Sequence, residues 1–179
     1  MVGETGGSRR QARERALSLL YEAESKDVAP AAVLAALPVE PAPYAAEVVT
    51  GVGEHLDELD KWIASYAKDW TIDRMPALDR ALLRMGVFEL LHRPDVPTGA
   101  VISEAVELAQ RFSTDESSRF VNGMLARIAE TVRGVGGEPP SNSASPAEAV
   151  DPEAVAPDPA VDDHAPAGEV LEDGFDEEG

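Results

Sequence analysis

The sequence predicts an all-α protein: a compact helical bundle followed by a disordered acidic tail. Apolar residues recur at steps of three and four through residues 8–133, and no run alternates strictly as a half-buried strand would. All 15 Lys and Arg residues lie at or before Arg133, whereas residues 134–179 hold 13 acids and seven prolines. Such a segment buries too little apolar surface to offset an ordering cost of roughly 1–2 kcal/mol per residue. We therefore expect a folded domain over residues 8–133 and disorder over 134–179.

Three helices are expected in the first half, over residues 8–25, 30–37 and 43–66. Ser8 to Gln11 form a capping-box pattern, and prolines at 30 and 43 suit the first turn of a helix. The third helix has the clearest apolar stripe but contains Gly51 and Gly53, each of which weakens a helix by about 1 kcal/mol relative to alanine. Either a close helix crossing or a kink is expected there, and the sequence leaves both open.

The second half predicts helices over residues 76–92 and 98–112, and a last helix that follows a turn at 113–117 and ends at Gly134. Residues 76–92 are apolar nearly all round, which is typical of a central helix surrounded by others. Within it, Glu89 is expected to pair with Arg93 at i,i+4. This makes six helices, or seven if residues 72–74 form a turn of their own.

Composition excludes several classes of protein. The net charge of −19 excludes a basic nucleic-acid coat, and the absence of Cys excludes disulfides and thiolate metal sites. No segment resembles a signal peptide or a membrane span, so we expect a soluble cytoplasmic protein. The three histidines lie on separate segments, and no nucleotide-binding or nucleophile motif is present. We expect no enzyme activity, no cofactor and no metal site.

Arginines at the start of the first helix conflict with the helix dipole, which favours anions there. At 100° per residue, Arg9, Arg10 and Arg13 fall within an arc of about 100° and would form a phosphate-sized patch. The alternative is a solvated helix start. The domain before the tail carries 15 bases and 21 acids, a net charge of −6. It would therefore bind RNA only through such a local patch, which we expect to face the same side of the bundle as Phe120.

Aromatic residues give a second, weaker indication of RNA binding. Tyr21, Tyr66, Trp70 and Phe120 lie near helix ends or charges, and single-stranded RNA is held by stacking together with backbone cations. Each is more often a core residue. The dipeptide Asn122-Gly123 interrupts an apolar period without ending it, which favours close approach of a helix at Gly123 over an amide offered to a base.

Four segments together resemble the bacterial transcription antitermination factor NusB family: SRRQARERALSLLYEAE, KDWTIDRMPALDRALLRMGVFEL, RPDVPTGAVISEAVELAQRFS and ESSRFVNGMLARIAE. The resemblance spans residues 8–133 and implies two packed three-helix subdomains. It also implies a non-enzymatic factor that binds the boxA element of ribosomal RNA leader transcripts. Its implied partners are the ribosomal protein NusE and the antitermination complex of RNA polymerase.

The resemblance assigns site residues. RNA binding is implied for Arg9, Arg10, Arg13, Tyr66, Trp70, Arg74, Glu116, Phe120 and Asn122, and partner binding for Tyr21 and Asp79. A homodimer is left open. Two alternatives are a helical protein-binding adaptor without specific RNA binding, and a stand-alone relative of the RNA-binding domain of RNA cytosine methyltransferases.

Overall fold

The structure, a computed structural model, describes residues 6–67 and 71–134. The predicted tail beyond Gly134 and the candidate residue Trp70 lie outside these described residues. The elements are α1 (Gly6–Lys26), α2 (Pro30–Ala35), α3 (Pro43–Glu54), α4 (Leu56–Tyr66), the 3-10 helix η1 (Ile72–Arg74), α5 (Ala77–His92), α6 (Thr98–Phe112) and α7 (Asp115–Gly134). No strand occurs in these two ranges, which confirms the all-α prediction.

Most helix boundaries follow the signals in the sequence. Pro30 and Pro43 occupy the first turns of α2 and α3, as expected. At the start of α7 the Thr114 hydroxyl accepts the backbone N–H of Ser117 at 3.1 Å, which caps the helix. The predicted start of α1 is wrong by two residues, because the helix already begins at Gly6.

The single helix predicted over residues 43–66 is wrong, since it forms two helices separated at His55. The backbone of His55 (φ −109°, ψ 16°) leaves the helical conformation, so α3 ends and α4 begins with a change of direction. Gly51 serves a close crossing instead, because a Cβ there would overlap the ring of Phe88 on α5. The sequence left a crossing and a kink open, and the chain uses both at neighbouring positions.

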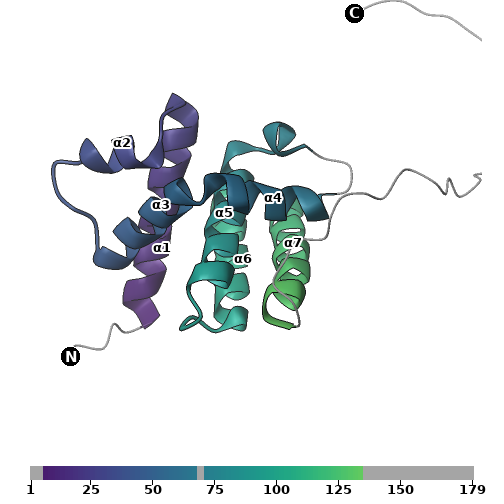
Figure 1. The fold of residues 1–179 in the computed structure, drawn as a ribbon. Helices are drawn as coiled ribbons and strands as arrows, with labels where there is room; N and C mark the ends of the chain where they lie inside the picture. The colour runs from purple at the N-terminus through teal and green to yellow at the C-terminus, as the bar shows by residue number, and fades with distance from the viewer. Residues whose placement is uncertain (1–5, 68–70, 135–179) are drawn as a thin grey trace, which may run out of the picture. The chain divides into compact units, whose positions relative to one another are not determined.

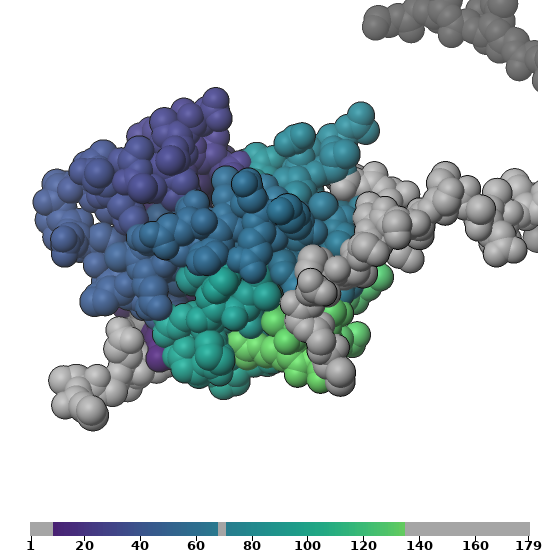
Figure 2. Space-filling model, viewed as in Figure 1, coloured from purple at the N-terminus to yellow at the C-terminus, as the bar shows by residue number. Residues whose placement is uncertain are grey.

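The helices form two groups around α5. Helices α1, α2 and α3 pack against one another, and α5, α6 and α7 do the same, while α4 lies on α5 and α7. Figure 1 shows the axes of α1, α5, α6 and α7 roughly aligned, with α1 on one side of α5 and α6 and with α7 on the other. In Figure 2 the blue segment with α3 and α4 crosses this face of the molecule from one group to the other. The expected two three-helix subdomains are thus present, with α4 as an additional helix that joins them.

Helix α5 is the centre of the core, as its apolar pattern predicts. Every residue from Ala81 to Leu90 is buried. At Gly86 a Cβ would stand 2.7 Å from Leu125 of α7, so glycine permits this close helix contact. No helix among the described residues is long and apolar enough to cross a membrane.

Arginines fix both helix groups to α5. Arg84 donates two hydrogen bonds of 2.7 Å to Asp60 of α4 and pairs with Glu24 of α1. At the end of α7, Arg133 donates to the carbonyl oxygens of Glu89, Leu90 and Arg93. The carbonyls of Glu89 and Leu90 lie in the last turn of α5, and Arg93 directly follows that helix. Arg133 therefore caps the C-terminal end of α5 from a neighbouring helix.

Candidate nucleic-acid interface

The arginines at the start of α1 point in two directions. Arg9 and Arg13 are one turn apart and share the face toward α3 and the end of α5, where both guanidinium groups lie over the ring of Tyr44. Arg10 is rotated by about 100° from Arg9 and turns toward α6. The expected single patch of three exposed guanidinium groups is therefore wrong.

Arg13 is buried and engaged inside the protein. Its side chain is 4% exposed, and its Nε donates to the two carboxylate oxygens of Glu89 at 2.9 and 3.1 Å. Burial alone would lower the pKa of Arg13, but the hydrogen bond and charge of Glu89 outweigh it and raise the pKa above its ordinary value. The predicted pairing of Glu89 with Arg93 is wrong, because the Glu89 carboxylate turns inward to α1.

Tyr44, on α3, completes this buried pair. Its hydroxyl donates a hydrogen bond to Glu89. Burial and the adjacent charge of Glu89 raise the pKa of the Tyr44 phenol well above its usual value, so the phenol stays a neutral donor. The guanidinium carbons of Arg9, Arg13 and Arg93 stand 5.4, 5.4 and 4.8 Å from the ring centre. We call Arg9, Arg13, Tyr44, Glu89 and Arg93 the Tyr44 cluster.

The outer side of the Tyr44 cluster is accessible and incompletely paired. Arg93 is held by Asp95 at 2.9 Å and by Glu47 at 2.6 Å. Arg9 reaches Asp95 only at 3.5 Å, and its Nε is buried without a hydrogen-bond partner among the described residues. A guanidinium with so long an ion pair can also bind a second anion at its exposed side. Arg9 is 32% exposed, against 4% for Arg13 and 14% for Arg93, so it is the arginine of this cluster that is best placed to donate to a phosphate oxygen.

Arg10 lies on the surface between α1 and α6. It donates to Glu104 at 2.9 Å and to Glu107 at 2.9 Å, and its side chain is half exposed. The hydrogen bond and charge of Glu104, together with the charge of Glu107, raise the pKa of Arg10. Its positive charge is balanced by two carboxylates, so a phosphate bound here has to displace exposed ion pairs.

Tyr66 lies where α4 meets α7. Its hydroxyl forms a 2.5 Å hydrogen bond with Thr131, and Arg127 stands 5.5 Å from the ring centre. Arg74 is exposed on η1, the segment that leads into α5. Tyr66 and Arg127 together offer an aromatic ring and a cation at one place, a combination that suits single-stranded nucleic acid.

The candidate residues of α7 do not all face one way. Glu116 and Asn122 are exposed and Phe120 is half-buried. Phe120 and Asn122 are two residues apart and therefore point about 160° apart around the helix. The structural interpretation of Gly123 is also wrong, because a Cβ at that position would meet no atom of another described helix within 4 Å.

Phe120 and the Tyr44 cluster lie toward opposite ends of α5. The last turn of α5 contacts Arg13 and Arg133, so α1 starts and α7 ends there. The first turn carries Asp79, which contacts Ser117 at the start of α7. Sixteen helical residues span about 24 Å. A ligand that touches both places is an extended strand, and the arginines do not flank Phe120 as expected.

The two expected partner-binding residues have different surroundings. Tyr21 is 45% exposed and lines a groove of about 400 Å³ with Leu17, Leu78 and Phe112, the last of which is 44% exposed. Asp79 is 3% exposed and accepts hydrogen bonds of 2.9 and 2.8 Å from Ser113 and Ser117. Tyr21 offers an apolar surface to a partner, whereas Asp79 holds the turn between α6 and α7.

Sequence reasoning missed several residues. Tyr44 lies in a segment that no motif marks, and Arg93 was expected to pair with Glu89 rather than to lie over Tyr44; only the fold brings both to α1. His55, Glu58 and His92 gather into a group that could hold a metal ion, contrary to the expected absence of any such site. The sequence signal for this histidine–glutamate group was the spacing His55-x-x-Glu58, which places both side chains on one side of a helical turn.

Comparison with known proteins gives consistent matches. The NusB family model matches residues 10–130. "Transcription antitermination protein NusB" of Salinispora arenicola is 53% identical over 131 residues, which cover 69% of this chain and 96% of that protein. The protein of the same name from Kineococcus radiotolerans is 51% identical over 127 residues, covering 69% and 93%. These are names of antitermination proteins rather than of enzymes.

Solved structures agree with these sequence matches. T. maritima NusB matches with a TM-score of 0.62 and 32% identity, over 68% of this chain and 90% of that one. A structure of the antitermination factors NusB and NusE in complex with dsRNA matches with a TM-score of 0.60 and 26% identity, over 70% and 98%.

Proposed function

This chain belongs to the NusB family, and from this premise we propose that it is a transcription antitermination factor. In this role it binds the boxA element of ribosomal RNA leader transcripts together with the ribosomal protein NusE. It has no catalytic activity of its own, and it works in the cytoplasm within the antitermination complex of RNA polymerase. The structural observation that carries the RNA-binding part is Arg9 at the edge of the Tyr44 cluster, which is 32% exposed and forms an ion pair with Asp95 of 3.5 Å.

We assign the phosphate contacts at this end of the bundle to Arg9 and Arg10. Arg9 is partly exposed and has a long contact to Asp95, and Arg10 is exposed and is held by the carboxylates of Glu104 and Glu107. Arg13 acts as a positioning residue: its bonds to Glu89 and its place over Tyr44 fix the first turns of α1. The RNA strand continues toward α4, η1 and α7, where the proposed contacts are Tyr66, Arg74, Glu116, Phe120 and Asn122. Trp70 stays a sequence prediction.

NusE is the proposed occupant of the groove beside Tyr21. A half-exposed tyrosine and a half-exposed phenylalanine on a folded domain are typical of a protein-binding surface. Asp79 contributes indirectly, because it fixes the turn that follows Phe112. A second copy of this chain is the competing occupant, and the mass of the protein in solution with and without NusE distinguishes the two.

Gel-shift titrations test the RNA-binding proposal. The titrations compare boxA RNA with a scrambled RNA of the same length, with and without NusE. We expect stronger shifts with boxA RNA and a further gain when NusE is present. Equal shifts for the two RNAs would contradict sequence-specific recognition and favour the adaptor alternative.

A matched pair of variants tests the assignment of residues. Arg9→Gln should weaken binding to boxA RNA, and Arg15→Gln serves as the control because Arg15 is exposed on another side of α1. Equal losses in both variants would indicate attraction by overall charge rather than a contact at Arg9.

A further inference from the structure

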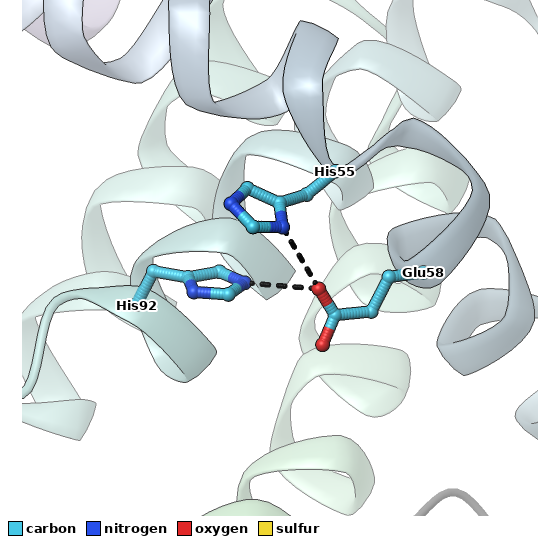
Figure 3. A group of neighbouring side chains, drawn as sticks. All are labelled: His55, Glu58 and His92. Atoms are coloured by element: carbon cyan, nitrogen blue, oxygen red, sulfur yellow. Dashed lines mark hydrogen bonds and ion pairs between the residues drawn. The ribbon is translucent and has the colours of Figure 1, made fainter.

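Two histidines and a glutamate converge at the junction of α3, α4 and α5. His55 lies at the break between α3 and α4, Glu58 lies one turn into α4, and His92 ends α5. Figure 3 shows the three side chains pointing toward one another. The Oε2 atom of Glu58 stands 3.0 Å from Nδ1 of His55 and 3.2 Å from Nε2 of His92. From this geometry we infer that His55, Glu58 and His92 form a binding site for a divalent transition-metal ion.

The spacing of the three ligand atoms suits a metal ion. One ligand atom from each residue lies within 4.8 Å of the others. Metal–ligand bonds of about 2.0–2.1 Å in a tetrahedral site place neighbouring ligand atoms about 3.3 Å apart. The two distances to Glu58 are already close to this value. Binding of one ion by all three ligand atoms requires the imidazole rings to turn from the arrangement in which both contact Glu58.

The rings are held in place by packing. The His55 and His92 rings stack with centroids 4.0 Å apart, and Phe88 stacks on His92 at 5.3 Å. Phe88 in turn fills the space left by Gly51, so the base of the site is part of the core. The break at His55 directs its ring to the end of α5. A ligand set fixed in this way needs little reordering on binding, which favours affinity.

The donor set selects the class of metal. Two imidazole nitrogens and one carboxylate favour zinc, copper or nickel over magnesium and calcium, which prefer oxygen ligands. The side chains are 38%, 45% and 29% exposed for His55, Glu58 and His92, so a bound ion keeps water in its remaining position. On binding, Nδ1 of His55 and Nε2 of His92 present lone pairs and each neutral ring carries its proton on the other nitrogen. The site is independent of the proposed RNA-binding residues.

Isothermal titration of the full chain with ZnCl₂ at pH 7.5, in excess MgCl₂, tests the inference. Magnesium occupies weak acidic sites, including any formed by the 13 acids after Gly134. We expect one Zn²⁺ per chain and at least a tenfold loss of affinity in both His92→Gln and Glu58→Gln. Glu58→Gln keeps a hydrogen-bonding group of the same size at an exposed position, so it tests the site even where His92→Gln perturbs folding. Circular dichroism checks that each variant is helical.

Two control variants identify where the ion binds. His164→Gln removes the remaining histidine, and Glu54→Gln removes an exposed carboxylate of α3 next to the site. Both should bind Zn²⁺ as the unchanged protein does. Zinc binding that is lost in His164→Gln, that persists in Glu58→Gln and His92→Gln, or that is absent in the unchanged protein would overturn the inference. With Cu²⁺, electron paramagnetic resonance should show coupling to two nitrogens, and coupling to none would also overturn it.

Discussion

Two arginine–glutamate contacts of α1 differ in burial, although the arginines are three residues apart. Arg13 and Glu89 are 4% and 1% exposed and lie in the core under Tyr44. Arg10 and Glu104 form a contact of the same length, 2.9 Å, on the surface. A buried pair whose partner is removed leaves an uncompensated charge in a medium of low dielectric constant, whereas a surface pair exchanges its partner for water. The comparison shows that one arginine-rich segment contains a structural ion pair and a replaceable one.

The largest expected effect comes from breaking the buried pair. Arg13→Met should lower the free energy of unfolding by about 3–5 kcal/mol, because Glu89 is left buried without its cation. Urea denaturation followed by circular dichroism measures the change. A loss comparable to that of a surface charge would contradict the structural role of Arg13.

The double variant Arg13→Met, Glu89→Gln sharpens this test. Glutamine removes the unpaired charge and still accepts the hydrogen bond from Tyr44. Much of the stability lost in Arg13→Met should therefore return. If the double variant is as unstable as the single one, packing of the arginine stem rather than its charge accounts for the loss.

A buried carboxylate without an arginine partner should have an intermediate effect. Asp79 is 3% exposed and is held by the hydroxyls of Ser113 and Ser117. Asp79→Ala should lower the free energy of unfolding by roughly 1–3 kcal/mol, since the buried hydroxyl of Ser117 and the partly buried hydroxyl of Ser113 lose their acceptor. Thermal melts measure this effect. Reduced binding of NusE by a variant of unchanged stability would instead indicate that Asp79 contacts the partner directly.

The contrast between Arg13 and Arg10 also shows which features of the fold can be predicted from the sequence. Most helix positions and the central role of α5 follow from local apolar spacing and proline positions, and those predictions are confirmed except for the break at His55 and the start of α1. The interior pairing of Arg13 does not follow from them, because Glu89 and Tyr44 are 76 and 31 residues away along the chain. A helical wheel shows that side chains share a face but not whether another helix covers it.

The same reasoning explains the candidate site. Arg9, Arg10 and Tyr21 are accessible as the sequence suggested, since each lies on a part of α1 that packing leaves open. Phe120 and the arginines were expected together because both suit RNA. Helix α7 runs parallel to α5 and α1 runs antiparallel to it, so the starts of α1 and α7 lie toward opposite ends of α5. The histidine site was missed for a related reason: the His92 end of α5 meets the start of α4 only in the folded chain.

Smaller effects are expected at the exposed arginines, and these appear in RNA binding rather than in stability. Arg10→Gln should leave the thermal midpoint essentially unchanged, because surface substitutions rarely alter stability much. Loss of one phosphate contact should make the log–log dependence of RNA affinity on salt shallower by about 0.7. Fluorescence anisotropy at several KCl concentrations measures this slope. An unchanged slope would place Arg10 outside the RNA contact and leave Glu104 and Glu107 as its permanent partners.

The smallest expected effect concerns the acidic segment after α7. Because it holds 13 acids and no basic residue, we expect it to compete with RNA for Arg9 and Arg10, which are accessible, but not for Arg13, which is covered. Truncation after Arg133 should therefore tighten RNA binding at low salt. The gain should fade toward 0.15 M salt, where screening acts within about 8 Å. A gain that persists at high salt, or an affinity that does not change at any salt concentration, would show that this charge does not reach the exposed arginines.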